Sequence, residues 1–261
     1  MNAKEMFNLS GKTAIVTGGG RGIGKFIATG LAEAGANLVI ASRKLQNCQN
    51  TANELENLGI KALALKMDVS IKEDVDHVVD ETMKTFKRID ILVNNAGITW
   101  GAPTLNFPLD KWEKIMDVNV KGVWMITQRV INIMKDMGGG KIINISSIYG
   151  ARGSLEEFHP AVAYNSSKAA IDLLTKNLAL KLARYKIYVN AIAPGFFNTD
   201  MMKYLFQPEM KGALDAILGF IPLARIGEID DIKALGLFLA SSASNYMTGA
   251  VIPVDGGLMA M

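Results

Sequence analysis

Short apolar runs rich in β-branched residues alternate with longer segments of helical periodicity along most of the 261-residue chain. The expected strands are apolar throughout, which is typical of parallel strands covered on both faces. Alternation of this kind favours right-handed crossovers and predicts a doubly wound α/β fold, a mainly parallel seven-stranded sheet with helices on both faces. We expect strands at Thr13–Val16, Asn37–Ala41, Ala62–Lys66, Ile89–Val93, Lys141–Ile145, Ile187–Ala193 and Val251–Val254, and helices that include Gly22–Ala34, Leu45–Leu58, Lys72–Phe86 and Ala161–Tyr185.

Length and composition favour one folded unit. At about 150 residues per domain, the length allows one large domain or two small ones. Hydrophobic residues at 49% and charged residues at 20% exclude a disordered chain. No linker rich in Pro or Ser and no charge block marks a boundary. We therefore expect residues 1–261 to form a single domain.

Charge and cysteine content exclude several classes of partner. A net charge of +3 is too small to indicate nucleic acid or an anionic membrane. The lone Cys48 cannot form an intramolecular disulfide, which suits a reducing compartment, and with only two histidines no metal site is indicated. Residues 234–254 are uncharged, but their polar residues, Gly249 and Pro253 argue against a membrane span. The N-terminus has no apolar core of signal-peptide length, so we expect a cytoplasmic protein.

The first expected strand leads through a glycine-rich turn directly into a helix. Glycines permit a tight turn and a close approach of phosphate to the backbone, while the helix N-terminus offers free N–H groups. The alternative is a plain glycine turn, which the strand–turn–helix context disfavours. We therefore expect a dinucleotide at Gly18, Arg21, Gly22, Ile23 and Gly24.

The end of the second expected strand distinguishes between the two nicotinamide dinucleotides. A carboxylate there would bind the ribose 2′-hydroxyl of NAD, whereas an arginine accommodates the 2′-phosphate of NADP. The strand ends in Ser42, Arg43 and Lys44 without a carboxylate. Arg43 can contact phosphate in a bidentate manner, and Arg21 can approach from the other side. The alternative is that Arg43 and Lys44 are solvated residues at a helix start, but the pattern favours NADP(H).

Tyr164 and Lys168 lie four positions apart in an expected helix, so their side chains share one face. A phenol with a pKa of about 10 is a poor acid–base group at neutral pH, and a neighbouring ammonium lowers that pKa. Such a pair arises by chance on many helices. Its meaning depends on the motifs around it.

Taken together and in order, these motifs resemble those of the short-chain dehydrogenase/reductase family from about Gly11 to Leu258. The family's glycine motif matches Thr17, Gly18, Gly22 and Gly24. Its remaining motifs match Asn94–Gly97, Asn119, Ser147, Tyr164 with Lys168, Pro194–Gly195 and Thr199.

The resemblance implies a Rossmann fold and a catalytic set of Asn119, Ser147, Tyr164 and Lys168. Tyr164 would exchange a proton with the substrate oxygen and Ser147 would hold that oxygen. Lys168 would lower the pKa of Tyr164 and contact the nicotinamide ribose, and Asn119 would hold a water of the proton relay. The family also implies a homotetramer. Further cofactor-lining positions, beside Tyr164 and Lys168, would be Asp68, Val69, Asn94, Ala96, Pro194, Gly195, Phe197 and Thr199.

Within the family the chain is most similar to the 3-oxoacyl-acyl-carrier-protein reductases, through Asn190–Phe196, Ile221–Arg225 and Val254–Gly257. The resemblance implies an NADPH-dependent carbonyl reductase, with 3-oxoacyl thioesters as the first substrate class. Dehydrogenases for sugar acids of the gluconate 5-dehydrogenase kind, polyols or hydroxysteroids share these features and remain alternatives. A non-catalytic dinucleotide sensor is a third reading, and the intact catalytic set argues against it.

One departure from the family lies beside the catalytic residues. Tyr164 follows Ser147 by 17 positions, four more than is usual, and we expect residues 150–160 to form an extended active-site loop. A loop there could reshape the substrate mouth. The resemblance also implies a substrate lid around residues 199–218. Ser146 is an alternative to Ser147. His159 in the extended loop is expected to be a partly exposed loop residue, the alternative being a contact with a polar substrate.

Overall fold

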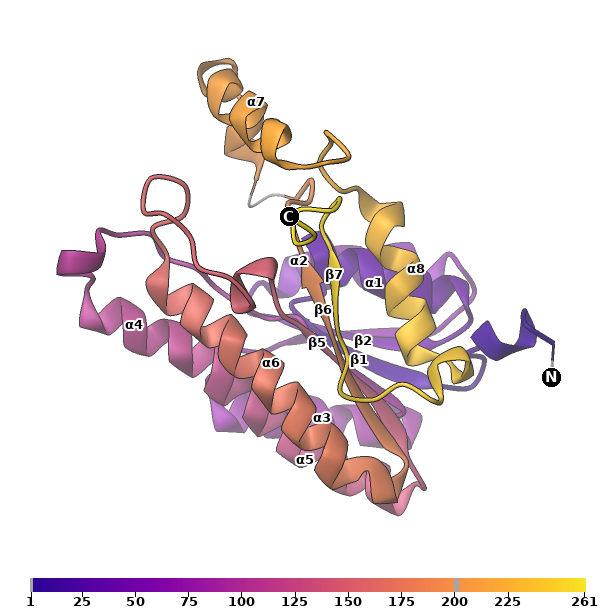
Figure 1. The fold of residues 1–261 in the computed structure, drawn as a ribbon. Helices are drawn as coiled ribbons and strands as arrows, with labels where there is room; N and C mark the ends of the chain where they lie inside the picture. Colours follow the sequence, from indigo (N-terminus) through magenta and orange to yellow (C-terminus); the bar gives the residue numbers. More distant parts are fainter. Residues whose placement is uncertain (1, 200–201) are drawn as a thin grey trace.

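The computed structural model describes residues 2–199 and 202–261 and contains one sheet in the order β3-β2-β1-β4-β5-β6-β7 (Figure 1). Each neighbouring pair of strands is parallel. The order reverses between β1 and β4, which is the topological switch point where ligands bind in such sheets. The strands are β1 (Thr13–Thr17), β2 (Asn37–Ser42), β3 (Ala62–Lys66), β4 (Ile91–Asn94), β5 (Gly140–Ile145), β6 (Ile187–Pro194) and β7 (Val251–Val254).

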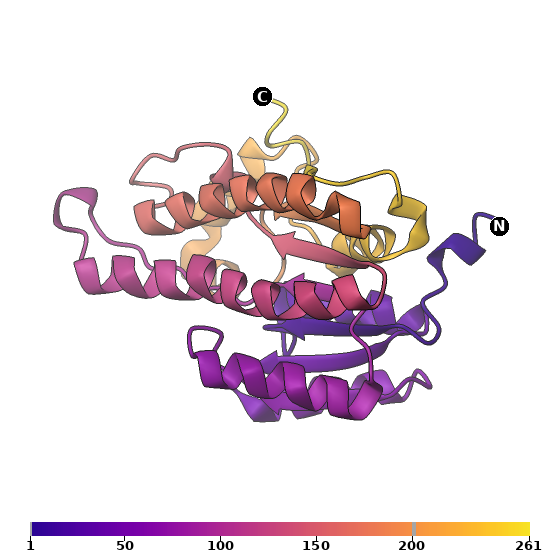
Figure 2. The same ribbon diagram turned by 90° about the horizontal axis from the view of Figure 1, so that it is seen from below.

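Helices cover both faces of the sheet, as the apolar strands predicted (Figures 1 and 2). One face packs against α1 (Gly22–Glu33), α2 (Leu45–Glu56) and α8 (Ile229–Ala240). The other packs against α3 (Lys72–Phe86), α5 (Val123–Asp136) and α6 (Val162–Leu182), which lie side by side in Figure 2. The remaining α-helices are α4 (Leu109–Met116) and α7 (Lys211–Phe220).

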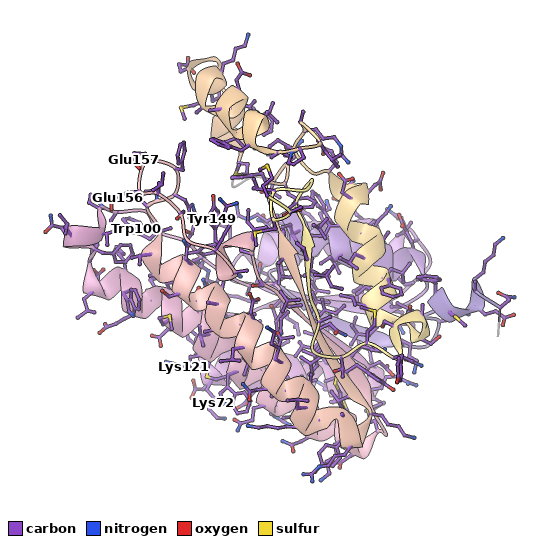
Figure 3. All side chains as sticks on the ribbon, in the orientation of Figure 1. Lys72, Trp100, Lys121, Tyr149, Glu156 and Glu157 are labelled. Atoms are coloured by element: carbon purple, nitrogen blue, oxygen red, sulfur yellow. The ribbon has the colours of Figure 1, made fainter. Side chains whose placement is uncertain are left out.

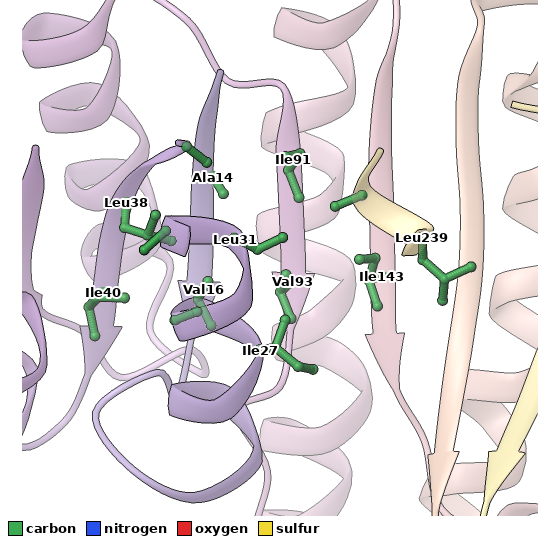
Figure 4. Close-up of a cluster of buried hydrophobic side chains, with 14 of the residues drawn as sticks. Ala14, Val16, Ile27, Leu31, Leu38, Ile40, Ile91, Val93, Ile143 and Leu239 are labelled. Carbon is green, nitrogen blue, oxygen red and sulfur yellow. The ribbon is translucent and has the colours of Figure 1, made fainter. Parts of the chain in front are cut away.

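Successive side chains of each central strand enter different cores. Ala14 and Val16 pack with Ile27 and Leu31 of α1 (Figure 4), whereas Ile15 belongs to the opposite core. All three β1 residues are fully buried. Because strand residues alternate in direction, a strand between two helical layers needs apolar side chains at every position. This confirms the predicted fold class.

The observed elements match the prediction closely, and β4 shows where apolarity alone misleads. The predicted bounds of β3, β7 and α3 are those observed, but β4 begins at Ile91, two residues later than predicted. Ile89 is fully buried, yet it lies in the loop before the strand. Its apolar side chain reflects burial in the core and not membership of the strand.

Between α4 and α5 the chain stays helical through a π-helical segment, Asp117–Gly122. Single π turns within α-helices are frequent at functional sites. This segment contains the predicted site residue Asn119, which is 1% exposed. The wider π turn therefore orients a buried amide within an otherwise regular run of helix.

Lys141 is a buried cation at the amino end of β5. Its Nζ donates to Ser244 Oγ at 3.1 Å and lies 4.0 Å from the ring centroid of Tyr188. Burial nevertheless lowers the pKa of Lys141 to about 8. The folded protein therefore holds the ammonium at a free-energy cost that the unfolded chain does not bear.

We expect Lys141→Met to raise the free energy of unfolding at pH 7 by about 1–3 kcal/mol. Between pH 8 and 10.5 the unfolded wild-type chain keeps a proton on Lys141 that the folded protein has lost. The free energy of unfolding of the wild-type protein therefore rises with pH in this range, and the difference between it and the variant becomes smaller. Urea unfolding at several pH values measures both effects. A variant with unchanged stability at pH 7 and an unchanged slope above pH 8 would contradict this account.

Candidate active site

A cavity of about 650 Å³ opens at the carboxyl ends of the strands around the switch point. It runs from the residues that follow β2 to those that follow β6. Most predicted cofactor residues line it. They are Gly18, Arg21, Gly22, Ile23, Ser42, Arg43, Asp68, Val69, Ala96, Tyr164, Lys168, Pro194, Gly195, Phe197 and Thr199, together with Ser147.

Three predicted site residues, Gly24, Asn94 and Asn119, are not among those that line the cavity. Asn94 is 2% exposed, and its Nδ2 donates to Thr127 Oγ1 and Asn144 Oδ1, both at 2.9 Å. It ties β4 to its neighbours from behind the cavity wall. Asn94 is therefore a polar residue at a buried position because its side chain belongs to a hydrogen-bond network with Thr127 and Asn144.

The glycine-rich turn has the backbone conformation that its sequence predicted. Gly18 and Gly22 have φ angles of +65° and +53°, in the left-handed region that other residues rarely adopt. A Cβ at Gly24 would lie 2.6 Å from the Gly18 carbonyl oxygen and closer still to the Asn95 side chain. The turn therefore folds tightly onto the start of α1, and Gly22 and Ile23 at the start of this helix line the cavity.

Gly24→Ala is expected to destabilise the protein by about 1–3 kcal/mol and to weaken dinucleotide binding, because the contacted oxygen belongs to the backbone of the turn. Thermal unfolding with and without dinucleotide measures both effects. Gly212→Ala is the matched control, since a Cβ at this α7 position meets nothing within 4 Å. Equal effects of the two substitutions would show that the turn tolerates a side chain.

Arginine and lysine side chains gather at the end of the cavity that follows β2. Arg43 and Lys44 line it with Asn47 from α2, and Arg21 lines it from the glycine turn. Both residues that follow Ser42 are exposed. The arrangement provides guanidinium groups for a phosphate.

Asp68 lies beyond β3 at the same end of the cavity. Burial alone would raise the pKa of its carboxyl, but hydrogen bonds from Ser70 and the positive charge of Arg43 hold that pKa below its ordinary value. Oδ1 accepts from Ser70 Oγ at 2.6 Å and from Ser70 N at 3.0 Å. The carboxylate is therefore charged and fixed at neutral pH.

Tyr164 and Lys168 lie one turn apart on α6, with Lys168 Nζ 5.5 Å from the Tyr164 ring centroid. Lys168 Nζ donates to the Ile145 carbonyl at 2.7 Å, and burial lowers the pKa of this lysine to about 8. Burial raises the pKa of the Tyr164 phenol, and its hydrogen bond with the Ser147 side chain only partly opposes this. Burial therefore decides the direction of this shift, and Lys168 is not among its causes, so a lowering of the Tyr164 pKa by Lys168 stays a prediction.

The two neighbouring serines point to different partners. Ser147 Oγ accepts from Tyr149 N at 3.2 Å, and its side chain hydrogen-bonds the Tyr164 phenol. Ser146 Oγ donates instead to the Lys168 carbonyl at 3.3 Å. The geometry therefore favours Ser147 over Ser146 as the partner of Tyr164.

Asn119 fixes the segment after β4 against α6. Its Oδ1 accepts from Ile98 N at 2.8 Å, and its Nδ2 donates to Ile98 O and to Ser167 Oγ, both at 2.9 Å. Ser167 Oγ in turn donates to the Tyr164 carbonyl at 2.7 Å. The Asn119 side chain thus holds two walls of the cavity in place.

Some cavity residues were missed from the sequence. Asn47 and Ile98 line the cavity, and each comes from a helix or loop beyond a strand end. Met202 lines it too, from within the lid expected around 199–218. His159 is a partly exposed loop residue, as expected. Its ring also packs between Tyr149 and Tyr164, which the sequence did not indicate.

None of the helices in the described residues is long and apolar enough to cross a membrane. Within residues 2–199 and 202–261, no group of three or more His, Cys, Asp or Glu side chains is placed to hold a metal ion.

Comparison with known proteins agrees with this geometry. Residues 12–210 match the model of the short chain dehydrogenase family. The rhamnolipids biosynthesis 3-oxoacyl-[acyl-carrier-protein] reductase of Pseudomonas aeruginosa is 39% identical over 96% of this chain and 97% of its own. The 5-keto-D-gluconate 5-reductase of Escherichia coli K12 is 35% identical over 98% of both chains.

A solved structure shares the whole fold. The gluconate 5-dehydrogenase of Burkholderia cenocepacia J2315, solved in complex with NADP and tartrate, has a TM-score of 0.91 and 37% identity and covers 100% of both chains. The chain therefore belongs to the short-chain dehydrogenase/reductase family and is an oxidoreductase that acts on carbonyl and hydroxyl groups.

Proposed function

We propose that this protein reduces a carbonyl group with NADPH, and that 3-oxoacyl thioesters are its first substrate class. The observation that carries the proposal is the convergence of Ser147, Tyr164 and Lys168 on one end of the cavity while Arg21 and Arg43 line the other. One end can move a proton, and the other can bind a phosphate.

The residues at the reactive end divide the chemistry between them. Tyr164 would donate a proton to the substrate carbonyl oxygen, and Ser147 would hydrogen-bond the same oxygen as negative charge develops on it. Lys168 would contact the nicotinamide ribose and help to return a proton to Tyr164. The cofactor supplies the hydride, and the protein orients it. Asn119 would support this set by fixing the segment after β4.

NADP(H) fits the cavity by several observations. The turn at Gly18 and Gly22 and the start of α1 provide backbone N–H groups for the pyrophosphate. Arg43, with Arg21, would bind the 2′-phosphate, and Asp68 and Val69 would contact the adenine. Ile23, Ser42, Ala96, Pro194, Gly195, Phe197 and Thr199 would complete the cofactor site, with Gly24 and Asn94 shaping it from behind.

The surroundings of the reactive end favour an apolar substrate. Exposed apolar side chains gather on three connected segments: Trp100 and Leu105, Leu155 and Phe158, and Phe220 of α7. Phe158 packs edge-on against Phe220 at 5.7 Å, which joins the extended loop to the last residue of α7, just beyond the proposed lid around 199–218. Residues 200 and 201 of that lid lie outside the described residues. An acyl chain suits this surface better than a polyhydroxy acid.

Two carboxylates add to this argument. Glu156 and Glu157 lie on the extended loop near Trp100 (Figure 3), and both are exposed. Glu156 accepts from Thr104 N at 2.8 Å, which fixes its charge beside the loop. An anionic sugar acid would be repelled here. Reduction of a keto sugar acid stays the second candidate, because a 5-keto-D-gluconate 5-reductase is among the relatives.

We also propose a cytoplasmic homotetramer. On α6, Ile171, Leu178 and Leu182 are buried within the chain. Leu173 and Leu180 on the same helix are 61% and 83% exposed, and Trp124 on α5 is 38% exposed. Exposed apolar side chains of this kind are what a second copy would cover. Light scattering during size exclusion tests the subunit count.

A substrate panel tests the proposed function. We would measure NADPH and NADH oxidation with a 3-oxoacyl N-acetylcysteamine thioester, the matching coenzyme A thioester, 5-ketogluconate and a cyclic ketone. We expect the thioesters to give the highest kcat/KM with NADPH. A higher value for 5-ketogluconate would move the assignment to the sugar-acid group, and turnover of none of the four would overturn it.

A further inference from the structure

We propose that His159 is a positioning residue for the phenol of Tyr164, and that the longer segment between Ser147 and Tyr164 serves to bring it there. The proposal rests on the proposed carbonyl reduction, in which Tyr164 moves the proton. His159 is absent from the residues that line the cavity, whereas Tyr164 is among them. His159 therefore contacts Tyr164 from outside the cavity.

The imidazole ring is held between two phenol rings. It stacks on Tyr149 with centroids 4.1 Å apart and planes 6° apart. It meets Tyr164 at 5.8 Å with planes 77° apart, an edge-to-face contact. Such contacts have preferred geometries, so they restrict where the Tyr164 ring can lie. Tyr149 is itself anchored, because its N–H donates to Ser147 Oγ.

The extended segment is tied down on both sides of His159. The His159 carbonyl accepts from Ser154 Oγ at 3.0 Å and from Ala161 N at 2.8 Å. Asn165 Nδ2 donates to the same Ser154 Oγ at 3.1 Å, which links the loop to the first turn of α6. Pro160 O accepts from Ala102 N at 2.8 Å. The imidazole is therefore placed by a braced loop.

Two buried polar atoms lie beside this ring contact. His159 Nε2 and Asn165 Oδ1 are both buried. Burial lowers the pKa of His159, and a hydrogen bond with the Asn165 side chain partly opposes this. Because Asn165 directly follows Tyr164, this interaction joins the imidazole to the first turn of the helix that carries the phenol.

The position of the phenol matters because proton transfer requires close alignment. Misplacement of a reacting group by about 1 Å can cost roughly 10²-fold in rate. Loss of His159 should therefore lower kcat and leave cofactor binding intact, since the cofactor end of the cavity is separate from it. KM should change little, because the imidazole does not line the cavity.

Two variants separate packing from a general structural role. We expect His159→Ala to lower kcat at least about tenfold, with KM and the NADPH dissociation constant within about threefold of wild type. His159→Phe keeps a ring between Tyr149 and Tyr164 and should restore kcat to within about threefold of wild type. Thermal unfolding confirms that each variant is folded. Equal kcat for His159→Ala and wild type, or an effect on KM alone, would overturn the proposal.

A measurement without turnover tests the contact itself. The chain has only two histidines, so His77→Gln, at an exposed position of α3, leaves His159 as the single imidazole. With ¹³Cε1-labelled histidine, we expect one resonance that moves when Tyr164→Leu removes the ring current. A resonance that stays in place would overturn the packing argument. If no carbonyl is reduced yet the resonance moves, the proposed function fails and the contact stands.

Discussion

Tyr164→Phe is expected to lower kcat for carbonyl reduction by about 10³-fold, because it removes the phenol hydroxyl that hydrogen-bonds the Ser147 side chain while keeping the ring. The NADPH dissociation constant should stay within about twofold of wild type, since the hydroxyl contributes little to cofactor affinity compared with the phosphate contacts. Stopped-flow single turnover and fluorescence titration of NADPH measure the two quantities.

Tyr149→Phe is the matched control for this experiment. Tyr149 stacks on His159 and raises the pKa of Tyr164 through its own phenol, but it does not line the cavity. Removal of the Tyr149 hydroxyl in this variant should therefore change kcat only a few-fold. If Tyr149→Phe abolished turnover and Tyr164→Phe did not, the proton would come from the other phenol.

Arg43→Ala is expected to raise the NADPH dissociation constant by about 10–100-fold, the effect of losing charge-assisted hydrogen bonds to a phosphate. The dissociation constant of NADH should change less than about threefold, because NADH lacks the 2′-phosphate. Titrations at two salt concentrations add a second readout, since the NADPH difference should shrink as salt rises.

Arg129→Ala provides the control for this substitution. The Arg129 guanidinium pairs with Asp80 at 2.6 Å on the outer side of α5 and α3, away from the cavity. Arg129→Ala therefore removes the same charge as Arg43→Ala without removing a cavity residue. Equal weakening of NADPH and NADH by Arg43→Ala would mean that Arg43 supports the fold of the site and does not contact the phosphate.

The fold could be predicted from the sequence because burial and strand membership coincide in most of this sheet. Ala14, Ile15 and Val16 are apolar because helices cover both sides of β1. Ile89 breaks the coincidence, since it is buried in a loop. The π turn around Asn119 could not be predicted, because its hydrogen bonds depend on contacts with Ile98 and α6.

The candidate site was partly predictable for a related reason. Residues that directly follow a strand, such as Gly18 and Arg43, reach the cavity because parallel strands end at one edge. The environment of Tyr164 was not predictable from the i, i+4 spacing. The spacing indicates Lys168 as a neighbour of Tyr164. The burial of the phenol and its contact with His159 depend on other chain segments, whose positions only the tertiary structure fixes.

The central claim is that this chain reduces a carbonyl with hydride from NADPH. Its most direct test is oxidation of NADPH and of NADH by the wild-type protein with a 3-oxoacyl N-acetylcysteamine thioester. We expect turnover whose kcat/KM is at least about tenfold higher for NADPH, in line with a phosphate contact at Arg43. A folded protein that binds NADPH but oxidises neither cofactor with this substrate or the rest of the panel would contradict the account.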